Sequence, residues 1–224
     1  QEGLPAHHGI PESVIPPALV EGLSAEIEKR MKRSKLAIPA GVSVKHCHLT
    51  REHFKILFGA AAEPKRVKDI KQPGFFAAEE MIDVKGPKGV LKKIRLVAPY
   101  RDHTQIEISV SDAMAIGLKP PVRESGDVKG SVGATLIGPA GQIETKEGVI
   151  IAQRHLHFSP SEARNLGIAS GEVVRVRAGA GGGRSTVFED VVVRVSDKYS
   201  LEFHVDTDEA NASGIKTGDV VHIA

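Results

Sequence analysis

The chain has 224 residues, with 30 Lys and Arg against 28 Asp and Glu, and one cysteine. The near balance of charge argues against a surface that coats nucleic acid, and one cysteine cannot form a disulfide within the chain. No apolar run approaches the roughly 20 residues that a membrane-spanning helix needs. We therefore expect neither a nucleic-acid nor a membrane partner.

Residues 1–38 differ in composition from the rest of the chain. They open with "QEGLPAHHGIPESVIPP", which is rich in Pro and Gly, has no period and predicts a flexible arm. Leu19, Leu23, Ile27 and Met31 follow at i, i+4 spacing, which predicts a helix with one apolar stripe. We favour a helix that packs on the body of the protein. The alternative is a helix that docks on a partner or on a shell.

A His-x-His motif occurs twice, in "KHCHL" and in "RHLHF", each time at the end of a β-type run. Successive side chains of a strand point to opposite faces, so His46 and His48 share one face, as do His155 and His157. Two imidazoles on one face can bind one metal ion. A half-exposed strand edge would explain a single copy, but two equivalent copies favour metal binding.

The similarity of the two halves extends beyond these motifs. After each motif comes a helix cap, Thr50 or Ser159, and each predicted helix stops at a glycine, Gly59 or Gly167. Many of the apolar residues are β-branched, which favours strands, and short Val-rich strands that follow tight turns are typical of small closed barrels.

This repetition predicts a mainly β fold with short α-helices, built by internal duplication. We expect two pseudo-symmetric small β-barrel domains, at residues 39–128 and 129–224. They would follow an N-terminal arm and amphipathic helix at residues 1–38.

A second alignment of the halves matches "QIEISVSDAMAIGLK" with "EFHVDTDEANASGIK" and places Glu107 opposite His204. Both residue types are good zinc ligands, and their neighbours match closely. The simplest account gives each half three protein ligands, which leaves an open coordination position, as catalytic zinc sites have. The alternative for both residues is a solvated strand face. The ligand sets would be His46, His48 and Glu107 in the first half, and His155, His157 and His204 in the second.

Arg101 stands six residues before Glu107. If the strand is regular, this even spacing places the guanidinium on the ligand face. An arginine beside two cations needs an anion between them, and its planar fork suits phosphate or carboxylate. The alternative is an ordinary surface arginine.

Together these motifs resemble the PduL-type phosphotransacylases, also called phosphate propanoyltransferases, from about Gly41 to Ala224. The most specific marks are "SVKHCHL", "QPGFFAAEE", "VAPYRDHTQIEIS", "RHLHFSPSEA" and "FHVDTDEANASG". The resemblance implies two Zn²⁺ per chain at the ligand sets above, with Arg101 as the catalytic contact to phosphate. It also implies coenzyme A contacts near Ser43, Arg95 and Asn211.

The implied reaction converts acyl-CoA and phosphate to acyl phosphate and coenzyme A, by direct attack of phosphate on the thioester. The resemblance favours propanoyl-CoA and leaves acetyl-CoA open. It also implies a homo-oligomer in the lumen of a cytoplasmic bacterial microcompartment, where the N-terminal segment contacts shell or lumen partners. One alternative is a dinuclear zinc hydrolase of esters or phosphoesters. Another is a non-catalytic module with a structural metal.

Overall fold

The computed structural model describes residues 16–179 and 181–224, and most of them lie in or between short β-strands. The predicted flexible arm lies almost entirely outside these residues. Five helices accompany the strands: α1 (Pro17–Lys35), α2 (Arg51–Phe58), α3 (Val110–Ile116), α4 (Pro160–Leu166) and α5 (Thr207–Ser213). The prediction of a mainly β fold with short helices and an N-terminal helix is confirmed.

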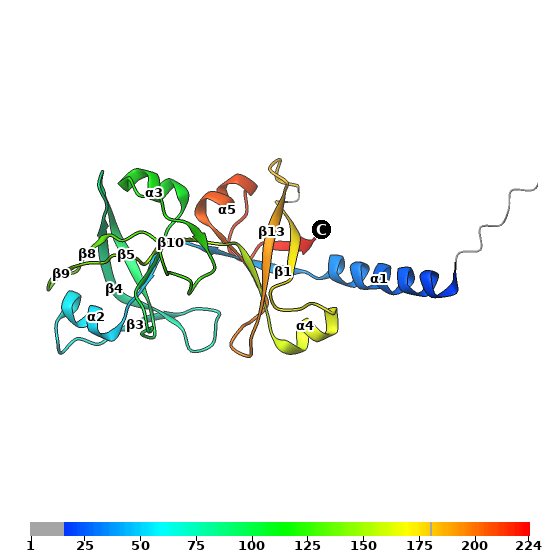
Figure 1. Ribbon diagram of the computed structural model, residues 1–224, viewed down its shortest axis with the longest axis horizontal. Helices are drawn as coiled ribbons and strands as arrows, with labels where there is room; N and C mark the ends of the chain where they lie inside the picture. The colour runs from blue at the N-terminus through cyan, green and yellow to red at the C-terminus, as the bar shows by residue number, and fades with distance from the viewer. Residues whose placement is uncertain (1–15, 180) are drawn as a thin grey trace, which may run out of the picture.

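The C-terminal half supplies most of a closed six-stranded barrel, on the right in Figure 1. Its strands, in spatial order, are β1 (Ile38–Ser43), β14 (Glu202–Asp206), β11 (His155–Phe158), β13 (Thr186–Val195), β12 (Val173–Ala178) and β15 (Val220–Ile223). Closure leaves this sheet without a free edge.

The remaining strands form a curled nine-stranded sheet, on the left in Figure 1. The order is β7 (Val122–Arg123), β10 (Val149–Ala152), β6 (Gln105–Glu107), β2 (His46–His48), β5 (Val90–Ala98), β4 (Phe76–Lys85), β8 (Thr135–Ile137) and β9 (Gln142–Glu144), with β3 (Arg66–Asp69) paired to β4. This sheet is therefore an open half-barrel. We call it the first module and the closed barrel the second module.

The same pairing pattern occurs in both sheets. Strand β2 runs parallel to β5 and antiparallel to β6, while β11 runs parallel to β13 and antiparallel to β14. Strand β10 then pairs in parallel with β6, just as β1 pairs in parallel with β14. The predicted duplication is thus visible in the strand topology.

The strands that precede the two motifs are exchanged between the sheets. Each β-type run that ends in His-x-His is split into two strands, β1 and β2 in one copy and β10 and β11 in the other. Strand β1 joins the barrel of the second half, and β10 joins the sheet of the first half. The exchanged strands are buried in their hosts, since Ile38 and Ala40 lie in the barrel core and Val149 lies in the core of the open sheet. The domain boundary at residue 128 stays a prediction, and both sheets contain strands from either side of it.

The helices begin and end as the cap residues predicted. The side chain of Thr50 accepts a hydrogen bond from the backbone of His53 at the start of α2. Ser159 and Glu162 form a capping box at the start of α4. Gly167 closes that helix in the left-handed conformation, with φ of 58°.

One ion pair is repeated in the two modules and ties each motif to a helix. Lys45 contacts Asp112 of α3 at 3.0 Å, and Arg154 contacts Glu209 of α5 at 2.6 Å. Both basic residues directly precede a His-x-His motif, so each ion pair holds the start of a motif against a helix.

The N-terminal helix does not pack along the body as we expected. The stripe of Leu19, Leu23, Ile27 and Met31 is 50–56% exposed, and α1 projects away from the two sheets (Figure 1). Its anchor is Arg33, which pairs with Glu172 at 2.6 Å and also donates to backbone carbonyls at the end of α4. None of the described helices is long and apolar enough to cross a membrane.

The strand exchange predicts that the halves cannot fold alone. A fragment of residues 129–224 lacks β1, and a fragment of residues 39–128 lacks β8, β9 and β10. We expect neither fragment to show a cooperative thermal transition by circular dichroism, because each exposes strand edges and apolar residues that are buried in the whole protein. The full chain is the control, and a cooperative transition in either fragment would contradict this expectation.

Candidate active site

Strand register brings the predicted ligands together in both modules. In the antiparallel pairs, His46 lies opposite Glu107 and His155 lies opposite His204. His48 and His157 join these pairs, because alternate residues of a strand face the same side. In each group the possible ligand atoms lie within 4.8 Å of one another: His46, His48 and Glu107 form one group, and His155, His157 and His204 form the other.

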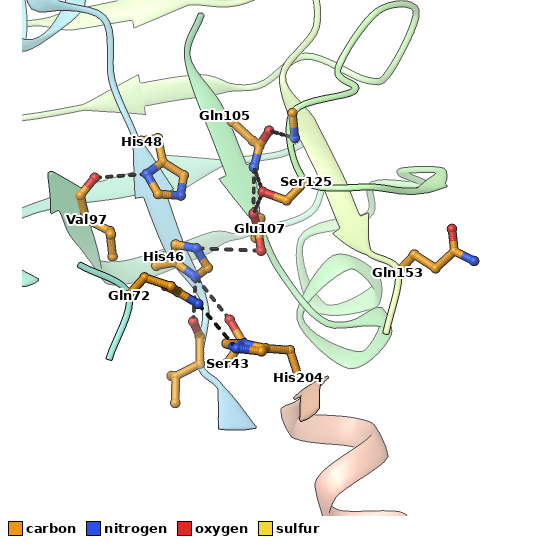
Figure 2. Close-up of polar contacts among 12 residues, drawn as sticks. Ser43, His46, His48, Gln72, Val97, Gln105, Glu107, Ser125, Gln153 and His204 are labelled. Atoms are coloured by element: carbon orange, nitrogen blue, oxygen red, sulfur yellow. Dashed lines mark hydrogen bonds and ion pairs between the residues drawn. The ribbon is translucent and has the colours of Figure 1, made fainter. Parts of the chain in front are cut away.

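Backbone carbonyls orient the first pair of imidazoles. Nδ1 of His46 lies 3.0 Å from the carbonyl oxygen of Val44, and Nδ1 of His48 lies 2.9 Å from that of Val97. Nε2 of His46 lies 3.6 Å from a carboxylate oxygen of Glu107 (Figure 2). The carbonyls therefore engage Nδ1 of each ring. Nε2 of each ring is left available for a cation, and that of His46 is directed at Glu107.

The second group repeats this arrangement with three imidazoles. Nδ1 of His155 lies 2.8 Å from the carbonyl oxygen of Gln153, which stands two residues before it, as Val44 stands before His46. The rings of His155 and His204 stack in parallel with centroids 4.9 Å apart. Nε2 of His157 is buried and has no hydrogen-bond partner among the described residues.

Burial keeps His155 and His157 uncharged. It lowers the pKa of His155 to about 3 and that of His157 to about 2, and neighbouring imidazoles add to the effect. Burial alone would raise the pKa of Glu107, but the imidazoles of His46 and His48 and a hydrogen bond from Ser125 lower it to about 2. Near neutral pH His155 and His157 therefore offer neutral imidazole nitrogens, and Glu107 offers a carboxylate, the protonation states that metal binding requires.

The donor sets fit zinc. Neutral imidazoles and carboxylates are its ordinary nitrogen and oxygen ligands, and three protein ligands leave a position for substrate. The buried Nε2 of His157 supports this interpretation, because a buried polar nitrogen without a partner is costly unless something binds it.

Two arginines from different modules meet at Ser125. Arg101 lies 3.4 Å from the hydroxyl of Ser125, and Arg194 lies 3.5 Å from its carbonyl oxygen. Burial lowers the pKa of Arg101, and the charge of Arg194 lowers it further. Two partly buried guanidinium groups that repel each other form a ready site for an anion such as phosphate.

Arg101 is held beside the site in a different way from the one predicted. The residue lies in the loop between β5 and β6, so the expected strand alternation does not place it. Its backbone N–H instead donates to the carbonyl oxygen of Leu49, directly after β2, which holds the loop beside the first ligand group. Its position near Glu107 therefore comes from a backbone contact between distant segments.

The sequence comparisons agree with these motifs. Residues 39–216 match the family described as phosphate propanoyltransferase. The chain belongs to the phosphate propanoyltransferase family. A phosphate propanoyltransferase of Thermotoga maritima is 42% identical over 207 residues, which cover 92% of this chain and 98% of that protein. Another, from Priestia megaterium, is 44% identical over 203 residues, which cover 89% of this chain and 93% of that protein.

Two further residues of this site, Arg194 and Gln72, were not predicted from the sequence. Arg194 pairs in register with His157, a relation that only the parallel β11–β13 pairing reveals. The side-chain amide of Gln72, in the loop between β3 and β4, lies 3.2 Å from Nδ1 of His157. The same amide lies 3.2 Å from Nε2 of His204 (Figure 2). Gln72 is the first residue of the motif "QPGFFAAEE", and that motif was the feature of the sequence that could have identified it as a site residue.

The residues expected near coenzyme A lie at different distances from the ligand groups. The hydroxyl of Ser43 lies 3.4 Å from Nδ1 of His46, and Arg95 pairs with His46 in register. Asn211 is exposed on α5, where its carbonyl accepts a hydrogen bond from Arg184. Ser43 and Arg95 therefore lie beside the first ligand group.

The pKa directions predict how acid affects the metal-free protein. Between pH 6.5 and about 3, the unfolded chain binds protons at His155 and His157 that the folded chain does not, so the free energy of unfolding falls as the pH falls. Each histidine contributes about 1.4 kcal/mol per pH unit, so we expect a loss of up to about 4 kcal/mol between pH 6.5 and 5. Urea unfolding with a chelator present measures this loss. His157→Gln should roughly halve the dependence, and an unchanged unfolding midpoint over this range would contradict the assignment.

Proposed function

We propose that this chain is a phosphate acyltransferase that interconverts acyl-CoA plus phosphate with acyl phosphate plus coenzyme A, using two Zn²⁺ per chain. Family membership supports the transferase class. The observation that carries the more specific proposal is the convergence of two ligand groups and two arginines where the modules meet. The six metal ligands proposed are His46, His48, Glu107, His155, His157 and His204.

Arg101 and Arg194 would bind the phosphate substrate. Their guanidinium groups approach Ser125 from opposite modules, so an anion between them can accept hydrogen bonds from both and relieve their mutual repulsion. Holding phosphate in this way turns its encounter with the thioester into a nearly intramolecular step. Bound zinc would act as a Lewis acid toward the substrate oxygens and has affinity for thiolate sulfur.

The bond changes need no covalent intermediate with the enzyme. A phosphate oxygen forms a bond to the carbonyl carbon of the thioester, the carbon–sulfur bond breaks, and coenzyme A leaves with the sulfur electron pair. Cys47 is fully buried and burial raises the pKa of its thiol, so it is poorly suited to act as a nucleophile. The reaction therefore proceeds by direct transfer of the acyl group to phosphate.

Ser43, Arg95 and Asn211 are proposed to contact coenzyme A. Ser43 and Arg95 would do so beside the first ligand group, and Asn211 from the exposed face of α5. The names of the relatives favour propanoyl-CoA as the acyl donor, and acetyl-CoA is the competing substrate.

The paired arginines favour a transferase over a zinc hydrolase of neutral esters with the same ligands. An ester hydrolase that uses water as nucleophile has no need of a positively charged anion site beside its metals, whereas a phosphoester hydrolase could bind its substrate there. The two activities are separated by whether coenzyme A release depends on phosphate.

The exposed helix α1 supports an interaction with other chains. Its stripe of Leu19, Leu23, Ile27 and Met31 is an apolar face that the rest of the described chain leaves uncovered. We propose that the protein is a homo-oligomer in the lumen of a bacterial microcompartment, with α1 contacting shell or lumen partners.

The phosphate role of Arg101 is tested by its replacement with alanine. We expect wild-type protein to release free thiol from propanoyl-CoA only when phosphate or arsenate is present. Arg101→Ala should raise KM for phosphate by about 10-fold to 100-fold, because a charge-assisted hydrogen bond contributes about 1.5–3 kcal/mol. Zinc content should stay at the wild-type level.

Arg175→Ala is the matched control, because Arg175 is an exposed arginine on β12 that pairs with Glu189. It should leave KM for phosphate unchanged. An Arg101→Ala protein with wild-type phosphate dependence would remove Arg101 from this role, and phosphate-independent release of thiol would favour the hydrolase.

A further inference from the structure

A buried polar residue stands two positions before the third ligand in each module. Gln105 precedes Glu107 on β6, and Glu202 precedes His204 on β14. Residues two apart on a strand share a face, so each of these side chains lies beside the ligand that follows it. The two positions are equivalent in the fold, since Gln105 lies opposite His48 and Glu202 lies opposite His157.

Gln105 donates a hydrogen bond to the ligand of the first module. Its amide nitrogen lies 2.6 Å from a carboxylate oxygen of Glu107 (Figure 2), and its amide oxygen accepts the N–H of Gly126 at 2.8 Å. The side chain is fully buried. Because the Gly126 contact fixes the orientation of the amide, Gln105 presents its donor and not its acceptor to Glu107.

Glu202 does the opposite for the ligand of the second module. Its carboxylate oxygen lies 2.9 Å from Nε2 of His204, where it can accept the ring N–H. Glu202 is 8% exposed, and a Cβ at Gly41 would come within 2.8 Å of its carboxylate carbon. Lys71 approaches the other oxygen at 3.6 Å. Close packing against β1 and this charge hold the carboxylate in place.

The hydrogen bonds of the two pairs run in opposite directions, and each direction suits its ligand. Where the ligand is a carboxylate, which only accepts hydrogen bonds, the neighbour is an amide that donates. Where the ligand is an imidazole, which donates through one ring nitrogen, the neighbour is a carboxylate that accepts. Both members of the pair change together between the modules, so the sequence reads Gln-x-Glu in one and Glu-x-His in the other.

We propose that Gln105 and Glu202 are matched positioning residues, each of which orients the third metal ligand of its module through a hydrogen bond of the required polarity. The inference rests on the zinc sites of the proposed function. Glu202 would hold Nε2 of His204 as a donor, so that Nδ1 is the ring nitrogen available to a cation. A buried carboxylate behind a ligating imidazole also makes the ring a better ligand.

The direct test is Glu202→Gln, which keeps the size of the side chain and removes its charge. Competition with a fluorescent zinc chelator gives the affinities of both ions without any activity measurement. Loss of an outer-sphere partner typically costs 10-fold to 100-fold in metal affinity, so we expect one ion to weaken by that factor while the other keeps its wild-type affinity. Glu144→Gln on the exposed strand β9 makes the same change of charge and should alter neither affinity.

A rescue experiment tests the matching itself. Glu107→His alone places an imidazole beside the donor amide of Gln105, and the first ion should weaken. Adding Gln105→Glu recreates the Glu-x-His pair of the second module and should recover at least 10-fold of the lost affinity.

Wild-type affinity for both ions in Glu202→Gln would overturn the role of Glu202, and failure of Gln105→Glu to improve Glu107→His would overturn the matching. Measurements on wild-type protein distinguish a failure of this inference from a failure of the proposed function. If wild-type protein binds no zinc, the zinc sites themselves are wrong. If it binds two ions yet releases no thiol with phosphate, the reaction is wrong and the positioning roles stand.

Discussion

The structure depends on one repeated constraint, the antiparallel pairing of a short His-x-His strand with the strand that carries the third proposed metal ligand. The registers of His46 with Glu107 and of His155 with His204 are the same. A slip of one residue would turn every ligand to the opposite face and bring apolar neighbours such as Cys47 and Leu156 into the site. Because both of these neighbours are fully buried on the core side, hydrophobic packing holds the register and, with it, the site.

The second constraint joins the two modules into one site. Strands β1 and β10 cross between the sheets, so each core contains strands from both halves of the sequence. Arg101 and Arg194 then approach Ser125 from opposite modules, and Gln72 reaches from the first module to the imidazoles of the second. The arginines repel each other where they meet, which favours an anion between them. The proposed phosphate site is thus a property of the junction and belongs to neither module alone.

What the sequence predicted well was local or repeated. The caps Thr50 and Ser159 follow from hydrogen bonds within one helical turn. The alignment of Glu107 with His204 came from comparing the halves, because duplication supplied a second example of the same environment. Arg194, by contrast, has no counterpart in any motif, and only the β11–β13 pairing brings it beside His157.

The wrong expectations share a cause, because each applied a local sequence pattern to residues outside the element that shows the pattern. Alternation was extended from β6 to Arg101 through a loop, and the run before each motif was treated as one strand. The stripe on α1 was expected to pack on the body, but it is exposed, and the anchor of the helix is Arg33 near its end. An apolar stripe indicates that one face of a helix is buried against another surface. The sequence of the helix does not identify that surface.

We propose that the protein holds two cations in equivalent positions, with three protein ligands to each. Anomalous diffraction at the zinc absorption edge, from crystals of the zinc-loaded protein, tests it most directly. We predict two peaks per chain, one among His46, His48 and Glu107 and the other among His155, His157 and His204. A map from zinc-loaded crystals with no peak at either group, or with peaks only elsewhere on the chain, would contradict it.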